Sequence, residues 1–269
     1  MRMYASMLNV MLRSWSHVIW FMFHLFIFGF LTVGLIIPFY ILFFIIAFLP
    51  ISERLMRWVS GIRPLRLMSE KARLIPLFEA VYTDYYWRES DIKHTQNIRL
   101  YIQESMSINA FAFGRETMVL TKGSIDLLSD ADLKGLMAHE LAHFHNYDSM
   151  RALFAYVANL PMSLLMKKLH QIDSSLENGF LRFFFKIIFW FFRLIEFTGE
   201  LIIMYHSREQ EYKADMYGLK WGYGEELARV LIHIYQISME RPKSIREMIK
   251  ATHPPITKRI ERLEQYLYL

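Results

Sequence analysis

The sequence predicts a mainly α-helical protein with a small β-sheet, in which a folded domain is anchored in a membrane and interrupted by a membrane hairpin. Three observations favour this fold class. Hydrophobic residues make up 54% of the 269 residues, including 22 Phe, 15 Tyr and 6 Trp, which is high for a soluble protein. Residues 18–49 form a run without Asp, Glu, Lys or Arg, and residues 152–166 and 180–205 are further hydrophobic stretches. The rest of the chain is polar enough for a folded domain.

The charge-free run from Val18 to Leu49 predicts a retained N-terminal anchor within residues 1–50. It exceeds the roughly 20 residues that a membrane-spanning helix needs. A signal peptide is the alternative, but its apolar core is only about 7–15 residues long and ends at a small-residue cleavage site. Two glycines and Pro38 permit a break, so the run is either one long span or a hairpin. Basic residues on both flanks favour a hairpin with both ends in the cytoplasm.

A basic segment follows this run. Its positive residues outnumber Glu53 and Glu70; they are Arg54, Arg57, Arg63, Arg66, Lys71 and Arg73. Nucleic-acid binding is one interpretation, but Lys/Arg-rich flanks of membrane segments stay in the cytoplasm, which explains the segment more simply. We therefore expect a lipid bilayer, and no nucleic acid, as a partner. The absence of cysteine excludes disulfides and thiolate metal ligands, and it fits a domain that faces the cytosol.

Residues 51–150 are expected to form the first part of the folded domain. Ser107–Phe113 and Thr117–Thr121 are rich in strand-forming residues and are separated by three residues that begin with a glycine, which predicts a β-hairpin. Ser129 and the acidic residues after it are typical of a helix start. The helix that begins there would carry residues 139–143.

Residues 151–205 are expected to form a second membrane hairpin, and residues 206–269 the second part of the folded domain. The charged residues of the hydrophobic stretch at 180–205 would fall on one stripe of a helix; they are Arg182, Lys186, Arg193, Glu196 and Glu200. Such a helix either lies flat at the membrane interface or spans with its charges facing a wet cavity or partner helices. The bulky apolar surface opposite the stripe favours spanning. Amphipathic helices are expected at 225–240 and 256–267.

The segment His139-Glu140-Leu141-Ala142-His143 predicts a metal centre. Two histidines four residues apart lie on the same face of a helix, so both imidazoles can bind one tetrahedral Zn²⁺. Glu140 can then take a proton from a water molecule at the metal. A chance match has a probability of about one per cent or less in a chain of this length. We expect one zinc ion per chain, although such a donor set also accepts other divalent ions.

The third metal ligand must come from elsewhere in the chain, because the glycine and third histidine of the extended motif are absent. The best candidate is Glu211, since Asp215 shares its helix face and could orient a ligating histidine. Glu209 is a rival, but its neighbour four residues later is a lysine, which is a poor partner for a histidine. If His139, His143 and Glu211 bind one ion, the intervening chain crosses the membrane an even number of times.

Four motifs resemble those of the HtpX-like integral-membrane metallopeptidases, which belong to family 48 of the metallopeptidases together with the CAAX-prenyl proteases. In chain order they are Asn109-Ala-Phe-Ala, the HELAH segment, Ser207–Asp215 and Thr252-His-Pro-Pro. The resemblance covers nearly the whole chain. It implies a gluzincin-type metallopeptidase in which His139, His143 and Glu211 are the zinc ligands. Glu140 would be the general base, and Asp215 would be the acid that orients a ligating histidine.

The resemblance also implies how a substrate binds. An extended polypeptide would pair with an exposed edge strand beside the metal, formed by Asn109, Ala110, Phe111 and Ala112. His253, in the His-Pro-Pro motif, would be a catalytic donor to the oxyanion. Tyr212 and Arg208 are further candidates for that donor.

By resemblance, the expected protein is an endopeptidase of the bacterial cytoplasmic membrane with its active site facing the cytosol. It would cleave membrane or membrane-associated proteins as quality control, and it would have two to four membrane helices. CAAX-prenyl-type processing is the alternative activity, although the chain is short for such an enzyme. A non-catalytic membrane scaffold is a third hypothesis. The intact Glu140 argues against it, because a protein that only holds zinc does not need that carboxylate.

Overall fold

The computed structural model describes residues 19, 22, 23, 41, 42, 45, 49–89, 97–175, 179–239 and 254–268. The chain divides into two compact units. One consists of Met1–Pro50 and Arg151–His206, and the other, called the motif unit below, consists of Ile51–Met150 and Ser207–Leu269. The motif unit is therefore discontinuous in sequence.

Two long helices, α8 (Asp148–Ser175) and α9 (Gly179–Lys220), provide most of the described residues of the first unit. Both hydrophobic stretches of the predicted second membrane hairpin lie within these helices. Among the described residues, no helix combines the length and the apolar character of a membrane span. Most of the predicted anchor at residues 18–49 lies outside the described residues, so both membrane segments stay predictions.

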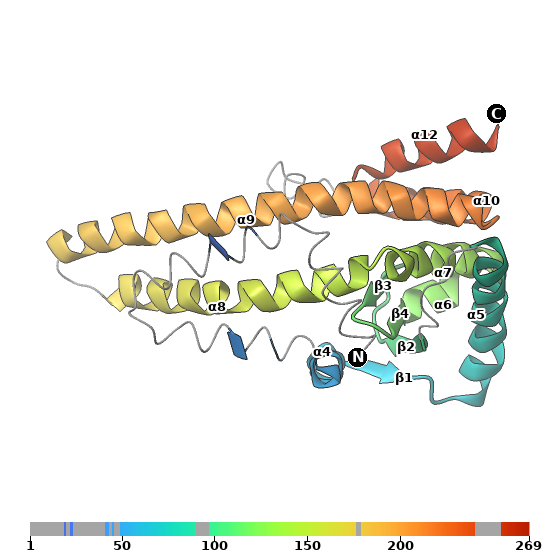
Figure 1. Cartoon of the computed structure of the whole chain (residues 1–269), viewed down its shortest axis with the longest axis horizontal. Helices are drawn as coiled ribbons and strands as arrows, with labels where there is room; N and C mark the ends of the chain where they lie inside the picture. The colour runs from blue at the N-terminus through green and yellow to red at the C-terminus, as the bar shows by residue number, and fades with distance from the viewer. Residues whose placement is uncertain are drawn as a thin grey trace. The chain divides into compact units, whose positions relative to one another are not determined.

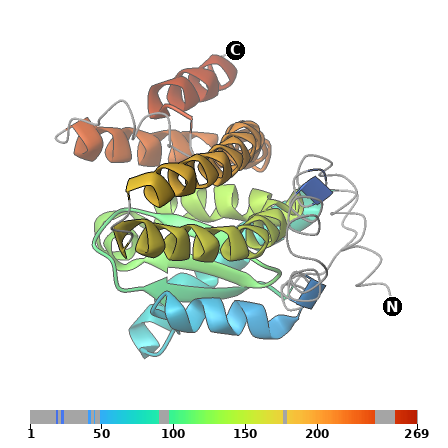
Figure 2. The ribbon, with the colours of Figure 1, turned by 90° about the vertical axis from the view of Figure 1, so that its left-hand side faces the viewer.

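The motif unit contains a four-stranded mixed sheet with the strand order β1-β2-β4-β3. Its strands are β1 (Ile62–Pro64), β2 (Arg99–Gln103), β3 (Ala110–Phe113) and β4 (Thr117–Thr121). The antiparallel pairing of β3 with β4 confirms the predicted hairpin, while β2 pairs with β4 in parallel. Strand β3 is an edge of this sheet. Figure 2 shows α4, drawn in blue, running along the strands.

Helices make up most of the motif unit. They are α4 (Pro50–Val59), α5 (Met68–Arg88), α6 (Lys122–Leu127), α7 (Asp130–His145), α10 (Gly224–Met239), α12 (Ile256–Leu267) and the C-terminal part of α9. Helix α7 packs against α5, α10 and β3, and α12 packs on α10 (Figure 1). The bounds of α10 and α12 agree with the two amphipathic helices that the sequence predicts. A mainly helical fold with a small sheet is thus confirmed.

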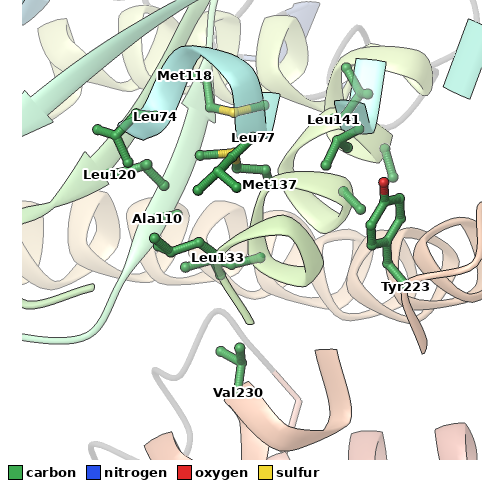
Figure 3. Close-up of a cluster of buried hydrophobic side chains, with 14 of the residues drawn as sticks. Leu74, Leu77, Ala110, Met118, Leu120, Leu133, Met137, Leu141, Tyr223 and Val230 are labelled. Carbon is green, nitrogen blue, oxygen red and sulfur yellow. The ribbon is translucent and has the colours of Figure 1, made fainter. Parts of the chain in front are cut away.

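The core of the motif unit lies around α7. Leu133, Met137 and Leu141 of this helix belong to one cluster of buried side chains with Leu74 of α5 and Met118 of β4 (Figure 3). Burial of each such side chain stabilises the fold by about 1.5–3 kcal/mol. Because α7 is packed on several sides, the polar residues on it are held in fixed positions inside the protein.

Local signals determine where α7 begins and ends. The hydroxyl of Ser129 accepts a hydrogen bond from the backbone N–H of Asp132, which confirms the predicted N-cap. At the other end, Tyr147 has a φ of +61°, a left-handed conformation that is rare for a residue with a side chain. This reversal stops α7 and starts α8 at Asp148, only five residues after His143.

Candidate metal centre

Three residues predicted as metal ligands lie together in the motif unit. The Nε2 atoms of His139 and His143 are 3.3 Å apart. One carboxylate oxygen of Glu211 is 3.4 Å from Nε2 of His139, and the other is 3.6 Å from Nε2 of His143. The donors come from α7 and α9, which are separated in sequence by the long segment of the first unit.

The spacing of these donor atoms fits a zinc ion. Zinc bound tetrahedrally by nitrogen and oxygen at about 2.0–2.2 Å requires ligand atoms about 3.3–3.6 Å apart. The distance between the two Nε2 atoms and the distance from each Nε2 to the nearer oxygen of Glu211 lie within that interval, the two histidines facing different oxygens of this carboxylate. His₂Glu is also a usual donor set for catalytic zinc, because it leaves the fourth position open.

A carboxylate lies next to the Nδ1 atom of each of the two imidazole rings. Nδ1 of His139 is 2.9 Å from Oδ1 of Asp215, and Nδ1 of His143 is 3.3 Å from Oδ2 of Asp148. An imidazole that donates its Nδ1–H to a carboxylate keeps the Nε2 lone pair for a metal and is fixed in orientation. Asp215 is the residue for which the sequence predicts this role. Asp148 has the same relation to the second histidine and was not predicted as a site residue.

Arg259 of α12 is a second charged residue of this cluster that was not predicted from the sequence. Its Nε and Nη2 groups donate to the two oxygens of Asp215 at 2.8 and 2.6 Å, and its Nη1 is 2.9 Å from Oε2 of Glu211. The residue is buried. A usable signal was present, because Arg259 shares the apolar face of the predicted helix with Ile256, Ile260 and Leu263.

The cluster carries an excess of negative charge. Its buried carboxylates, within the described part of the chain, are Glu140, Asp148, Glu211 and Asp215. Arg259 is the buried guanidinium that opposes them. Buried charges in such imbalance favour the uptake of a cation.

The buried charges of the cluster also shift the pKa values of the site residues. Burial and the Arg259 charge lower the pKa of His139, but hydrogen bonds to Asp215 and Glu211 outweigh them and leave it raised. Burial also lowers the pKa of His143, yet Asp148 and Glu211 raise it well above its ordinary value. For Asp215, burial raises the pKa, but Arg259 and His139 leave it lowered. The carboxylates therefore attract positive charge to the two rings, and a metal ion would compete with protons for the same nitrogens.

The glutamates with a predicted role at the site are buried, whereas the rival Glu209 is exposed. Glu140 is buried, and it offers a carboxylate oxygen in a group in which all donor atoms lie within 4.8 Å of one another, together with the two histidines. Glu209, the rival third ligand, is exposed on α9, whereas Glu211 is only 4% exposed. The geometry therefore favours Glu211 over Glu209.

The predicted substrate strand lies at an edge of the sheet and packs against α7. Its first residue is engaged through its backbone, since Asn109 N–H donates to Ser124 Oγ at 2.8 Å and Asn109 C=O accepts from Thr121 N–H at 3.1 Å. Bonding to β4 alternates along an antiparallel strand, so Phe111 and Phe113 continue the pattern. The backbone groups of Ala110 and Ala112 are consequently directed to the free edge.

The other histidines and candidate donors are placed as follows. His253 lies outside the described residues, so its predicted role stays a prediction. His145 packs in an aromatic cluster with Tyr85, Tyr217 and Trp221. Tyr212 is half-buried, and the guanidinium of Arg262 lies 4.9 Å from its ring centre.

Known proteins resemble the chain in sequence and in fold. Residues 71–267 match the model of peptidase family M48. A protease HtpX homolog of Tropheryma whipplei is 30% identical over 192 residues, which cover 62% of this chain and 65% of the relative. A protease HtpX homolog of Bifidobacterium longum is 31% identical over 200 residues, covering 62% of this chain and 64% of the relative. The aligned region thus spans slightly less than two-thirds of these relatives.

A solved structure supports the fold. The crystal structure of S. mikatae Ste24p superposes with a TM-score of 0.56 and 18% sequence identity, covering 98% of this chain and 66% of that one. At this identity the likeness concerns the fold alone.

Proposed function

The chain belongs to peptidase family M48, and on that premise we propose that it is a membrane-embedded, zinc-dependent endopeptidase. The observation that carries the proposal is the triangle of His139, His143 and Glu211, whose donor distances fit tetrahedral zinc. The motif helix, the third carboxylate and the acids behind both rings all belong to one buried cluster. CAAX-prenyl-type processing is the less favoured activity, because the similar curated proteins are named protease HtpX homologs.

In this proposal each residue has a defined role. Zinc, when bound, would act as a Lewis acid on the scissile carbonyl and would lower the pKa of the attacking water to about 7. Glu140 takes the proton of the attacking water and passes it to the leaving amine. Asp215 and Asp148 hold the two imidazoles in their binding orientation. His253 is proposed as a donor to the oxyanion.

The substrate would bind as an added strand on β3. Ala110 and Ala112 offer the backbone N–H and C=O groups for the pairing, and the side chain of Asn109 is exposed next to the start of the strand. Strand addition requires an unfolded or extended segment. This requirement fits the cleavage of damaged membrane or membrane-associated proteins.

The membrane location rests on the sequence. The charge-free run at residues 18–49 and the basic residues after it favour insertion with the motif unit on the cytosolic side. A bacterial cytoplasmic membrane is proposed by similarity to the HtpX homologs.

The test compares zinc content and cleavage of fluorescein-labelled casein for the purified full chain and three variants. Glu140→Gln should keep zinc and lose cleavage by at least about 100-fold. Glu211→Ala should lose zinc, and Glu209→Ala is the matched control, because Glu209 is exposed two residues away on the same helix. Full zinc occupancy in Glu211→Ala would refute the third ligand. A zinc-bound wild type that cleaves nothing would support the scaffold instead.

A further inference from the structure

Helix α4 presents an apolar face to the outside of the motif unit. Ile51, Leu55, Trp58 and Val59 are all exposed, Trp58 by 79%. Their spacing of four, three and one residues places them on one side of the helix. An apolar stripe of a helix normally faces a protein core, so this orientation requires an explanation.

The opposite side of α4 is fixed to the sheet. Glu53 is buried, and its carboxylate accepts hydrogen bonds from Arg115 N–H at 2.6 Å and Thr117 Oγ1 at 2.9 Å. Arg57 donates to the same Thr117 hydroxyl at 2.7 Å. Gly114, at a φ of +65°, allows this approach, because any side chain there would overlap the Glu53 carboxyl. The helix therefore cannot rotate to bury its apolar face.

The exposed charge of the chain segment that begins with this helix is positive. Glu53 and Glu70 are the acidic residues between residues 51 and 73, and both are buried and hydrogen-bonded. Arg54 is exposed on α4 itself, and Arg66, Leu67 and Met68 are exposed further along the chain, between β1 and the start of α5. The exposed side of α4 thus combines a tryptophan and aliphatic side chains with an arginine.

We propose that this face of α4 lies on a membrane surface that contains anionic lipids. Leu55 and Trp58 would enter the boundary between headgroups and acyl chains, and Arg54 and Arg66 would contact lipid phosphates. The predicted anchor ends at Leu49, one residue before α4 begins, so the chain leaves the bilayer where this helix starts. The proposal shares its membrane location with the proposed function, but it does not depend on the peptidase chemistry.

The docked helix would also position the substrate strand. Glu53 holds the turn between β3 and β4, and β3 is the edge strand. Lipid contact on one side of α4 would therefore set the height of that edge above the bilayer. A segment that emerges from the membrane could pair with the strand without leaving the interface.

The test uses the full chain reconstituted in vesicles, with single cysteines introduced into the cysteine-free sequence. Leu55→Cys and Val59→Cys are labelled with an environment-sensitive fluorophore. Leu127→Cys on α6 is the control, because Leu127 is 58% exposed and Leu55 is 53% exposed. We expect quenching at residues 55 and 59 by lipids that carry a nitroxide near the headgroup, stronger with phosphatidylglycerol than with phosphatidylcholine alone, and little quenching at residue 127.

Charge reversal tests the lipid specificity. Arg54→Glu with Arg66→Glu changes two exposed residues and should weaken surface docking by roughly fivefold per arginine. Equal quenching in both lipid mixtures would overturn the anionic-lipid proposal. A fluorophore at residue 55 that is shielded from water but not quenched would show that protein covers the face, which also overturns it. Cleavage is not measured, so these outcomes are distinct from failure of the peptidase proposal.

Discussion

The Arg63–Glu70 and Arg259–Asp215 pairs have the same bidentate chemistry in two different settings. Arg63 donates to the two oxygens of Glu70 at 2.7 and 3.1 Å, and Arg259 donates to those of Asp215 at 2.6 and 2.8 Å. The first pair lies at the start of α5. The second lies inside the candidate metal centre.

The partners outside each pair distinguish a structural pair from a functional one. Glu70 also accepts the backbone N–H groups of Arg66 and Leu67, so its acceptors are occupied and the pair caps a helix. Asp215 instead faces His139, and Arg259 faces Glu211. Charge at the second pair is therefore coupled to the atoms proposed to bind zinc. A bidentate pair alone indicates stability, whereas contact with paired imidazoles indicates a site.

Removal of Arg259 should have the largest effect on stability. Arg259→Met leaves Glu211 and Asp215 buried without their counter-charge, which should destabilise the protein by about 3–5 kcal/mol and lower the melting temperature on the order of 10 °C. Zinc should raise the melting temperature of this variant more than that of the wild type, because a divalent cation replaces the lost charge. Thermal unfolding in detergent, with and without zinc, measures both effects.

Arg63→Met is the matched control for that experiment. It removes the other bidentate arginine, which has no contact with the proposed ligands among the described interactions, so zinc should not restore its stability. An identical response of the two variants to zinc would remove the distinction between the pairs.

Asp215→Asn should weaken zinc binding by about 10–100-fold, since the acid that orients His139 loses its charge. Competition with a chelator of known affinity measures the change. Glu70→Gln is the control and should bind zinc as the wild type does. Unchanged affinity in Asp215→Asn would mean that the histidine is oriented by the packing of α7 alone.

Glu70→Gln should cost about 1 kcal/mol of stability at neutral pH, because one acceptor is retained while the ion pair is lost. Hydrogen bonds from Arg63 lower the pKa of Glu70 from 4.5 to about 2 in the folded protein. The carboxylate therefore stabilises the fold fully above pH 4.5, and this contribution is lost as the pH falls toward 2. Unfolding measured between pH 7 and pH 3 should show the difference from wild type becoming smaller.

Glu104→Gln removes the other carboxylate partner of Arg63 and is compared with Glu70→Gln. Glu104 accepts from Nε of Arg63 at 2.7 Å but is 56% exposed, so its loss should cost less than about 0.5 kcal/mol. A larger cost than that of Glu70→Gln would contradict the assignment of the buried carboxylate as the stabilising partner.

Local patterns in the sequence predict much of the motif unit. The hairpin of β3 and β4, the Ser129 cap and the bounds of α12 follow from alternation, capping residues and helical periodicity. The paired histidines follow from their spacing of four, because a single helix holds them. Burial supports Glu211 over its rival, since Glu209 on the same helix is exposed.

Several contacts between distant segments were not predicted from the sequence. Arg259 lies 44 residues after Asp215, and nothing local to either residue indicates that they meet. The roles of Glu53 at the hairpin turn and Asp148 behind His143 likewise depend on how the elements pack. Strands β1 and β2 were also missed, since short strands carry little periodicity of their own.

The position of Arg259 in the chain has a consequence during synthesis. A nascent chain that has reached residue 240 contains both histidines of α7 and Glu211, but it lacks the guanidinium that balances the buried acids. Chains fold as they emerge, with N-terminal parts first. The buried acids Glu211 and Asp215 therefore acquire this counter-charge only after α12 has been made.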